Sequence, residues 1–474
     1  MMDDVSQREL QLPPDALRTA ADAVFERILD RYASISHEPA VRVPEADFPP
    51  PALQGDPPEE GRDIACVLDE LDRDVWRWGV NLAHPRFFAF IPAPGNAVGV
   101  LGDALASAYN PFVGTWLGGA GPSALEARVV DWLRKACGYP PSAGGLLTSG
   151  GSLANLTALA AARLNLSPDS VDACVAYVGD QTHYSSHRAL RVIGIAERNV
   201  RVIPSDDGER IDVEQLRRRV VEDRNAGGLP LCVVASAGTT GTGVVDPINE
   251  LADVCGHYGM WLHVDGAYGA SAALSPKLRP RLGAIERADS ISVDPHKWLF
   301  QPIAIGCLLV REPQRLQRAF RETPDYLREV HATRQVNFAD LGLELTRGFR
   351  ALKLWMTVQY FGMRRVRAAI EHGAALAEFA EEVLASTPGV TVVTPASLGI
   401  VTFRFTFDGG NAREDQLNAE LVRKLTRDGR AMVSSTAING RTVLRLCTIN
   451  PSSVGSDVEQ AVELLAELAG QMRS

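Results

Sequence analysis

The stretch Ser292-Val293-Asp294-Pro295-His296-Lys297-Trp298 places a single lysine directly after a short apolar, β-branched run. About thirty residues upstream, His263-Val264-Asp265-Gly266-Ala267-Tyr268 ends another apolar run in an aspartate. Alone, such a lysine is usually a surface charge and such an aspartate a turn residue. At the ends of two neighbouring strands, however, an amine and a carboxylate are the pair that pyridoxal phosphate (PLP) needs. The amine bonds to its aldehyde and the carboxylate keeps its pyridinium nitrogen protonated, so Lys297 and Asp265 predict a PLP site.

The bulk composition limits the class of protein. At 474 residues the chain is too long for one ordinary core, so two or three structural units are expected. Hydrophobic residues make up 46% and charged residues 22%, as is typical of a globular enzyme. The net charge of -10 argues against non-specific binding to nucleic acid.

Location and metal content are predicted from what the sequence lacks. The acidic start has no apolar signal segment, and no apolar stretch approaches the ~18–20 residues that span a bilayer. We therefore expect a cytoplasmic protein with no membrane partner. The seven cysteines lie far apart, without a Cys-x-x-Cys pair or a Cys/His cluster, so neither a metal site nor disulfides are expected.

The N-terminal region predicts a helix and an extended arm. Apolar residues at helical spacing indicate a helix over 14–34, and a proline-rich connector follows over 39–58. Such an arm has no core of its own and must pack on something, for which a partner subunit is one candidate. We predict an N-terminal helical arm over 1–84.

Beyond the arm, the pattern predicts an α/β fold. Helical and short apolar segments alternate, which favours a largely parallel sheet covered by helices, with binding sites at the carboxyl ends of its strands. The expected helices lie near 122–137 and 151–165, and the expected strands at 173–178, 231–236, 260–264, 290–293 and 304–310. These segments belong to a predicted large domain over 85–355.

The C-terminal part predicts a smaller α+β domain over 356–474. A long helical pattern begins at about 343 and includes Leu352, Leu354, Trp355 and Val358. The strands expected after it lie at 390–393, 400–405 and 443–446, and the helices near 413–428 and 456–472.

Two glycine-containing segments are candidates for cofactor binding. In Thr148-Ser149-Gly150-Gly151-Ser152, glycines open a helix whose N-terminal amides favour an anion, although for this segment alone a simple serine N-cap with a tight turn is the more frequent explanation. The second segment, 238–243, has its glycines in the reverse of the dinucleotide order, so a nicotinamide site is not expected. Thr240 and Asp246 could instead line the far side of a cofactor.

A histidine follows the expected strand at 173–178. In Gln181-Thr182-His183, the imidazole could lie flat against a pyridine ring or move a proton. A single histidine more often has a structural role, with its hydrogen bonds made within the fold. His183 is therefore a candidate site residue only together with the other predicted site residues.

Together these segments resemble the group II PLP-dependent decarboxylases, the family of aromatic-L-amino-acid and glutamate decarboxylases. The motifs TSGGSLAN, QTHYSSH, AGTTGTGVVD, HVDGAYGAS and DPHKW occur in the family's order, and the resemblance extends from His84 to Arg445. It implies the fold-type I architecture, with an N-terminal arm, a seven-stranded, mainly parallel large domain and a small C-terminal domain. It also implies a homodimer with the active site between subunits.

The resemblance assigns roles residue by residue. Lys297 corresponds to the lysine that binds the cofactor, Asp265 to the partner of the pyridinium nitrogen, and His183 to the histidine stacked on the ring. The other cofactor positions implied are Gly150, Gly151, Ser152, Thr240, Asp246, Ala267 and His296. The implied substrate pocket includes Phe90, Pro92, Phe112 and Trp116.

The implied reaction is decarboxylation of an L-amino acid to its amine and carbon dioxide. Which bond breaks depends on orientation, because the carboxylate must stand perpendicular to the cofactor ring. The aromatic residues of the implied pocket favour an aromatic substrate. A glutamate or aspartate substrate would need a facing cation, and these segments offer no obvious one.

One position departs from the family pattern. In aromatic decarboxylases a loop tyrosine donates a proton to the α-carbon, and an ungapped count places Phe338 there. A benzyl side chain has no proton to donate. In plant relatives the same change accompanies oxidative deamination, which gives an aldehyde, ammonia and hydrogen peroxide. Alternatively, the count is wrong by several residues, or Tyr326 or His331 supplies the proton.

Two further alternatives stay open. An aminotransferase of the same fold would use an arginine to hold the α-carboxylate, and Arg445 is a candidate. A binding protein that has lost its chemistry would not need to keep Lys297, Asp265 and His183 together. Decarboxylation is therefore the favoured interpretation.

Overall fold

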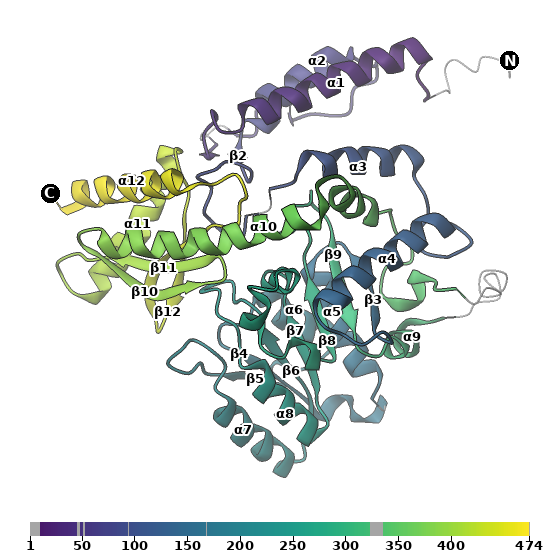
Figure 1. Cartoon of the computed structure of the whole chain (residues 1–474), viewed down its shortest axis with the longest axis vertical. Coiled ribbons are helices and arrows are strands. Elements are labelled where there is room, and N and C mark those ends of the chain that lie inside the picture. Colours follow the sequence, from purple (N-terminus) through teal and green to yellow (C-terminus); the bar gives the residue numbers. More distant parts are fainter. Residues whose placement is uncertain are drawn as a thin grey trace.

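A seven-stranded sheet forms the centre of the larger unit of the computed structural model, which describes residues 10–44, 48–50, 53–92, 94–166, 168–322 and 335–473 (Figure 1). All neighbouring strands are parallel except those next to β9, which is antiparallel to both β3 and β8. In sheet order the strands are β3 (Gly144–Thr148), β9 (Gly306–Val310), β8 (Ser290–Val293), β7 (Trp261–Asp265), β6 (Leu229–Ser236), β4 (Cys174–Gly179) and β5 (Val200–Ile203). The predicted seven-stranded, mainly parallel sheet is confirmed.

The central strands are almost continuously apolar because both faces of the sheet are covered by helices. Along β6, Cys232 and Val234 pack into the core on one face, whereas Val233 and Ala235 pack into the core on the other. The covering helices are α4 (Ala120–Ala136), α5 (Gly151–Leu164), α6 (Tyr184–Val192), α7 (Val213–Asn225), α8 (Ile248–Tyr258) and α9 (Gln314–Phe320).

All five strands expected in the large domain are present, but two strands at the edges of the sheet were not predicted. β3 is short, and β5 carries the partly exposed Arg201 in its middle. β5 is only partly buried, so its sequence shows no clear apolar pattern, whereas β3 is buried but begins with two glycines, which are unfavourable in strands.

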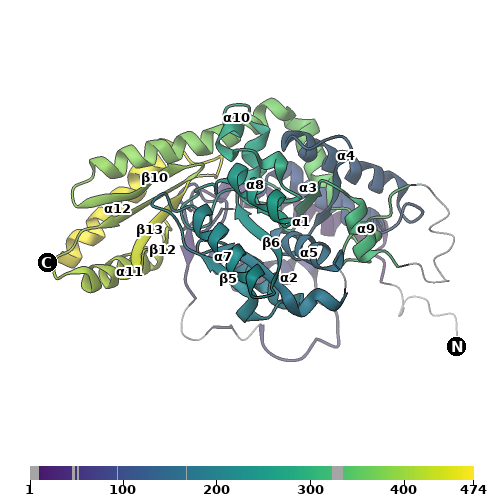
Figure 2. The same ribbon diagram turned by 90° about the horizontal axis from the view of Figure 1, so that it is seen from below.

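The smaller unit is a four-stranded antiparallel sheet with its own core. Its order is β10 (Val390–Ser397), β11 (Ile400–Phe405), β13 (Arg441–Cys447) and β12 (Ser434–Ile438). It packs with α10 (Ala351–Ser386), α11 (Asn411–Asp428) and α12 (Gly455–Arg473) (Figure 2). The predicted α+β unit is confirmed, although β12 was missed because its polar residues carry no apolar run.

The two units share chain segments near the predicted boundaries. Helix α10 continues through the boundary at 355/356 and bends at Gly362, whose φ of 74° lies in the left-handed region. After the other boundary, Phe88 donates its backbone N–H to the Met432 carbonyl at 2.8 Å and packs in the core of the small unit. The predicted domain limits therefore stay predictions.

The N-terminal arm is helical, as predicted. Helix α1 (Pro14–Ser34) lies beside α2 (Ile64–Leu71), and its Arg27 guanidinium contacts Asp72, the residue that follows α2, at 3.0 Å. None of the residues of α1 is buried. Figure 1 shows both helices set apart from the body, above α3 (Ala97–Tyr109). The connector also contacts this chain's small unit, through β1 (Val41–Arg42), which pairs with β2 (Gly79–Val80).

None of the described helices combines the length and the apolar character that crossing a membrane requires.

Candidate active site

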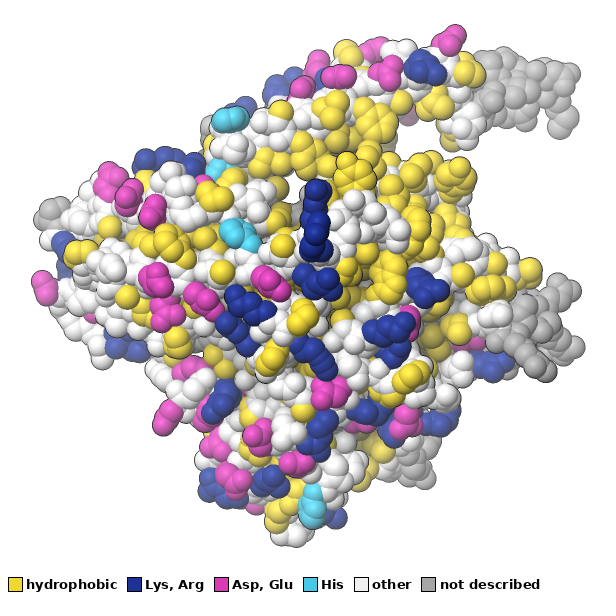
Figure 3. Space-filling model, viewed as in Figure 1, with side chains coloured by type: hydrophobic (Ala, Val, Ile, Leu, Met, Phe, Trp, Pro, Cys, Tyr) yellow, Lys and Arg dark blue, Asp and Glu magenta, His cyan; other side chains and the backbone are white. Residues whose placement is uncertain are grey.

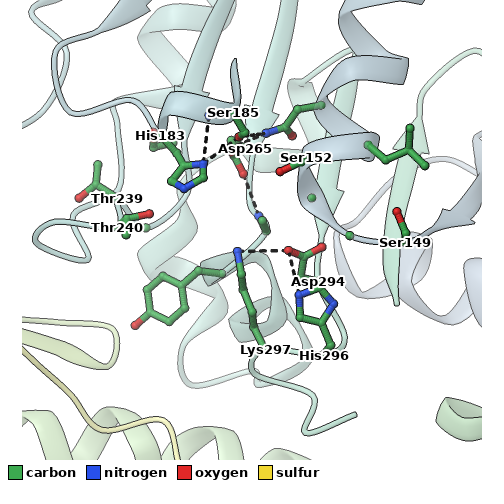
Figure 4. Close-up of a pocket in the computed structure, with 18 residues that line it drawn as sticks. Ser149, Ser152, His183, Ser185, Thr239, Thr240, Asp265, Asp294, His296 and Lys297 are labelled. Atoms are coloured by element: carbon green, nitrogen blue, oxygen red, sulfur yellow. Dashed lines mark hydrogen bonds and ion pairs between the residues drawn. The ribbon is translucent and has the colours of Figure 1, made fainter. Parts of the chain in front are cut away.

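A cavity of about 370 Å³ lies at the carboxyl ends of the central strands (Figure 4). This is where ligands bind in sheets of this kind, because the loops after parallel strands open at one edge. It collects nine of the predicted site residues: Gly150, Gly151, Ser152, His183, Thr240, Asp265, Ala267, His296 and Lys297. The fold therefore brings together segments that are far apart in the sequence.

Lys297 lies in the turn that follows β8, with its amine in the cavity. Its Nζ is 3.1 Å from Asp294 Oδ2, and His296 Nε2 is 3.6 Å from the same oxygen. His296 Nδ1 lies 2.7 Å from the Ile305 carbonyl and donates to it, which fixes the ring. The lysine is thus held by a carboxylate until another group competes for its amine.

Asp265 ends β7 and is buried, but its carboxylate is well supplied with donors. Oδ2 accepts from Asn155 Nδ2 at 2.8 Å, and Oδ1 accepts from the Ala267 N–H and the Ser292 hydroxyl, both at 3.1 Å. Burial by itself would raise the pKa of Asp265, but the Lys297 charge and these hydrogen bonds hold it below its usual value. Asp265 is therefore an anion at neutral pH.

His183 immediately precedes α6 and caps it. Its Nδ1 accepts from the Ser185 N–H at 3.3 Å and lies 2.8 Å from the Ser185 hydroxyl. Burial lowers the pKa of His183, so its imidazole is neutral at pH 7. Because Nδ1 accepts, Nε2 carries the proton.

The N-terminus of α5 forms one wall of the cavity. A Cβ atom on Gly151 would lie 2.8 Å from both the Ala267 Cβ and Asp294 Oδ2, so only glycine fits there. The backbone N–H groups of a first helical turn have no partner within the helix and attract anions. This wall therefore suits a phosphate group.

The remaining predicted cofactor residue, Asp246, does not line the cavity. It is buried, and its two oxygens accept from the backbone N–H groups of Ile211 at 2.9 Å and Ser236 at 2.6 Å. Burial raises the pKa of Asp246 to about 6. Asp246 therefore links the end of β6 to the segment after β5 through these two hydrogen bonds. Its contact with a cofactor stays a prediction.

The predicted substrate residues also lie outside the cavity of this chain. Phe90 is 53% exposed and Phe112 39% exposed, while Pro92 is buried and Trp116 partly buried. The Trp116 N–H donates to Asn337 Oδ1 at 2.9 Å. None of the four therefore forms part of the cavity wall within one chain, and the two phenylalanines are exposed.

Phe338 lies in the core of the large unit. It is 2% exposed, packs in the cluster that contains Leu146 and Leu341, and has the Arg347 guanidinium 5.4 Å from its ring centre. Its ring does not line the cavity. The alternative donors Tyr326 and His331 lie outside the described residues.

Sequence reasoning missed several residues that line the cavity. Asn155, Ser185 and Asp294 all stand inside the quoted motifs, but only the three-dimensional contacts give them a function. The cavity is also lined by Ser149, Leu153, Ser236, Gly238, Thr239 and Tyr268.

The residues present fit PLP. They supply a primary amine, a helix N-terminus and an ionised carboxylate. A carboxylate accepts about four hydrogen bonds, and Asp265 receives three from the protein, which leaves one for a ring N–H. No group of metal-ligating side chains occurs among the described residues.

Comparisons with known proteins agree with this fit. Residues 51–406 match the family described as the pyridoxal-dependent decarboxylase conserved domain. An aromatic-L-amino-acid decarboxylase of Bacillus atrophaeus is 41% identical, over 98% of this chain and 97% of that protein.

Two solved structures cover 98% of this chain and 100% of their own chains, each with a TM-score of 0.91. One is tryptophan decarboxylase of Catharanthus roseus in complex with L-tryptophan, 29% identical, and the other is 4-hydroxyphenylacetaldehyde synthase of Rhodiola rosea, 28% identical. Fold and site together define a fold-type I PLP-dependent enzyme. Within that class, the chain belongs to the pyridoxal-dependent decarboxylase family, and it is an amino-acid decarboxylase.

The first prediction concerns acid stability. Burial lowers the pKa of both His263 and His84 to about 4, whereas in the unfolded chain each binds a proton below about 6.5. Between these values the unfolded state holds more protons, so the contribution of each histidine to stability falls by roughly 3 kcal/mol as the pH falls from 6.5 to 4. Buried Asp246, whose pKa is raised to about 6, acts in the opposite direction and offsets part of this loss. Denaturant unfolding of the cofactor-free protein at pH 7 and pH 5 measures this.

The control is His263→Gln, which cannot titrate. It should flatten the pH dependence only in part, because His84 remains. An unchanged slope in this variant would contradict the assignment.

Proposed function

We propose that this enzyme removes the α-carboxyl group of an aromatic L-amino acid and releases the amine and carbon dioxide. The observation that carries the proposal is the cavity in which the Lys297 amine and the Asp265 carboxylate meet, beside the N-terminus of α5. The aromatic substrate class is supported by the similarity to the Bacillus atrophaeus and Catharanthus roseus decarboxylases.

We further propose roles for the residues that hold the cofactor. Lys297 would bond to its aldehyde, Asp265 would accept from its ring nitrogen, and His183 and Ala267 would lie against its ring. Gly150, Gly151, Ser152 and His296 would hold its phosphate, and Thr240 would contact its far side. When bound, PLP supplies an electron sink for the pair that carbon dioxide leaves behind.

The chain's own contribution is orientation and electrostatics. Asp265 must stay ionised to keep a ring nitrogen protonated, and its buried hydrogen bonds favour that state. His183, neutral and proton-bearing at Nε2, donates only from that atom. A substrate carboxylate held perpendicular to the cofactor ring would favour decarboxylation over other reactions.

We propose that the enzyme is a homodimer. Apolar side chains are exposed on α1, on α3 and on nearby loops; among them Tyr109 is 83% and Leu345 70% exposed. Figure 3 shows a broad hydrophobic surface on the body below the arm. An apolar surface of this extent usually marks a protein interface. The exposed Phe90 and Phe112 would then complete the active site of the partner subunit, where they would meet the substrate.

Two rival reactions receive less support. Arg445, the candidate carboxylate holder of an aminotransferase, is buried and donates to the carbonyl of Phe90, and it does not line the cavity. The aldehyde-forming route occurs in the family, since a phenylacetaldehyde synthase of Petunia hybrida is 28% identical to this chain. That route stays a second candidate because Phe338 replaces the loop tyrosine in the ungapped count. The cytoplasmic location also stays a prediction.

The substrate proposal predicts a product pattern. With added PLP, tryptophan, tyrosine or phenylalanine should give amine and carbon dioxide in equal amounts, detected by mass spectrometry and gas release. Lys297→Ala should lose at least a thousandfold in rate, since no other described amine lies in the cavity. Faster turnover of glutamate than of every aromatic substrate would contradict the proposed class.

The dimer proposal predicts the effect of a charge in the apolar surface. Tyr109→Asp should convert a dimer into a monomer in analytical ultracentrifugation, because burying an unpaired carboxylate is costly. Activity should fall with the loss of the dimer. Val202→Asp on the edge strand β5, 55% exposed, is the matched control and should leave the dimer intact. A wild-type protein that sediments as a monomer at micromolar concentration would rule out the proposal.

The placement of Phe338 predicts that it does not set the product. Phe338→Tyr should bury a hydroxyl in an apolar cluster and destabilise the protein by about 1–3 kcal/mol. The ratio of amine to aldehyde and peroxide, measured in air, should not change. A shift from aldehyde to amine would instead support the oxidative alternative.

A further inference from the structure

A buried chain of hydrogen bonds lies between strands β7 and β8 and helix α5, and the proposed roles use only its last bond, from Asn155 to Asp265. It begins at Trp261 on β7, whose Nε1 lies 2.8 Å from the Ser290 hydroxyl on β8. That hydroxyl is 2.8 Å from His263 Nδ1, and His263 Nε2 is 2.9 Å from Asn155 Oδ1 on α5. All four side chains are buried. The chain of contacts ends at the cavity.

Asn155 connects this chain of hydrogen bonds to two of the proposed cofactor residues, Asp265 and His183. Its Nδ2 donates to Asp265 Oδ2 at 2.8 Å and to the Ser185 hydroxyl at 3.1 Å. Ser185 in turn contacts His183 Nδ1 at 2.8 Å. One amide group therefore connects the carboxylate of the site with its imidazole, the latter through the Ser185 hydroxyl.

The direction of every bond in this chain is fixed by its two ends. The Trp261 indole can only donate and the Asp265 carboxylate can only accept. Asn155 must therefore turn its NH₂ toward Asp265, because the opposite orientation would place two acceptors 2.8 Å apart. Its oxygen then faces His263, whose Nε2 must carry a proton, and the Ser290 hydroxyl donates to His263 Nδ1.

We infer that Asn155 and His263 are positioning residues that hold Asp265 in the ionised, correctly aimed state in which it receives the ring nitrogen of PLP. The inference rests on the role proposed for Asp265. His263 does not touch the cavity; it acts by keeping the Asn155 amide in one orientation. Without it, Asn155 could rotate and present its oxygen to the carboxylate.

The experiment compares the affinity of the cofactor-free protein for PLP with its affinity for an analogue that has CH in place of the ring nitrogen. Absorbance or fluorescence titration gives both dissociation constants. Asn155→Leu and His263→Leu should each weaken PLP binding by roughly tenfold to a hundredfold, as expected for a lost charge-assisted hydrogen bond. Both variants should bind the analogue no worse than the wild type does, because the analogue has no ring nitrogen for Asp265.

Two variants serve as matched controls. His263→Gln retains an N–H donor toward Asn155 and should recover most of the PLP affinity. Thr157→Val removes a buried hydroxyl from the same helix, whose one hydrogen-bond partner among the described residues is the Leu153 carbonyl, and should bind both compounds as the wild type does. Melting of each cofactor-free variant checks folding. Should His263→Leu fail to fold, Ser290→Ala replaces it and should give a smaller loss of the same kind.

The outcomes separate this inference from the proposed function. Wild-type affinity for PLP in Asn155→Leu and His263→Leu, or an equal loss for PLP and the analogue, would overturn the positioning role. A loss of PLP affinity in Asn155→Leu but not in His263→Leu would show that His263 has no positioning role. If the wild-type protein and Asp265→Asn bind PLP and the analogue alike, the role proposed for Asp265 itself fails.

Discussion

The site depends on one buried negative charge. A carboxylate removed from water costs several kcal/mol unless donors replace its hydration, and Asp265 sits at the end of a fully buried strand. Its donors come from three places: the turn that follows it, the neighbouring strand β8 and helix α5. The pairing of Asp265 with Ser292 in the parallel register of β7 and β8 supplies one of them directly. The fold around the cavity thus keeps the Asp265 carboxylate ionised at the position where the protonated ring nitrogen of PLP would bind.

The order of the strands explains how distant residues meet. β4, β6, β7 and β8 are parallel, so the segments that follow them, with His183, Thr240, Ala267 and Lys297, open at one edge. β9 then returns antiparallel beside β8. Its approach places the Ile305 carbonyl against His296, which fixes the ring next to Lys297. A parallel strand would need a longer crossover at this position and would leave that turn less tightly held.

The sequence indicates the part of the site that follows strongly apolar runs. Lys297 and His183 come just after buried strands and Asp265 ends one, and an apolar run of that kind is visible without a structure. Polar residues inside the runs are harder to interpret, because His263 and Ser290 look like exceptions to an apolar pattern. Their partners are set by strand register and by the placement of α5, which no local pattern encodes. Edge strand β5 and the polar β12 were missed for a related reason, since both bury too little to produce a clear pattern.

The substrate-binding wall raises a different physical question. Decarboxylation benefits from an enclosed site, because excluded water strengthens the electrostatic interactions within it. In one chain the cavity contains mainly polar side chains, while the aromatic residues predicted for the wall lie on a partly exposed surface. Leaving that surface and the apolar faces of α1 and α3 in water is unfavourable. The proposed dimer would remove both costs at once: burial of the apolar surfaces would stabilise the assembly, and the same contact would enclose the site.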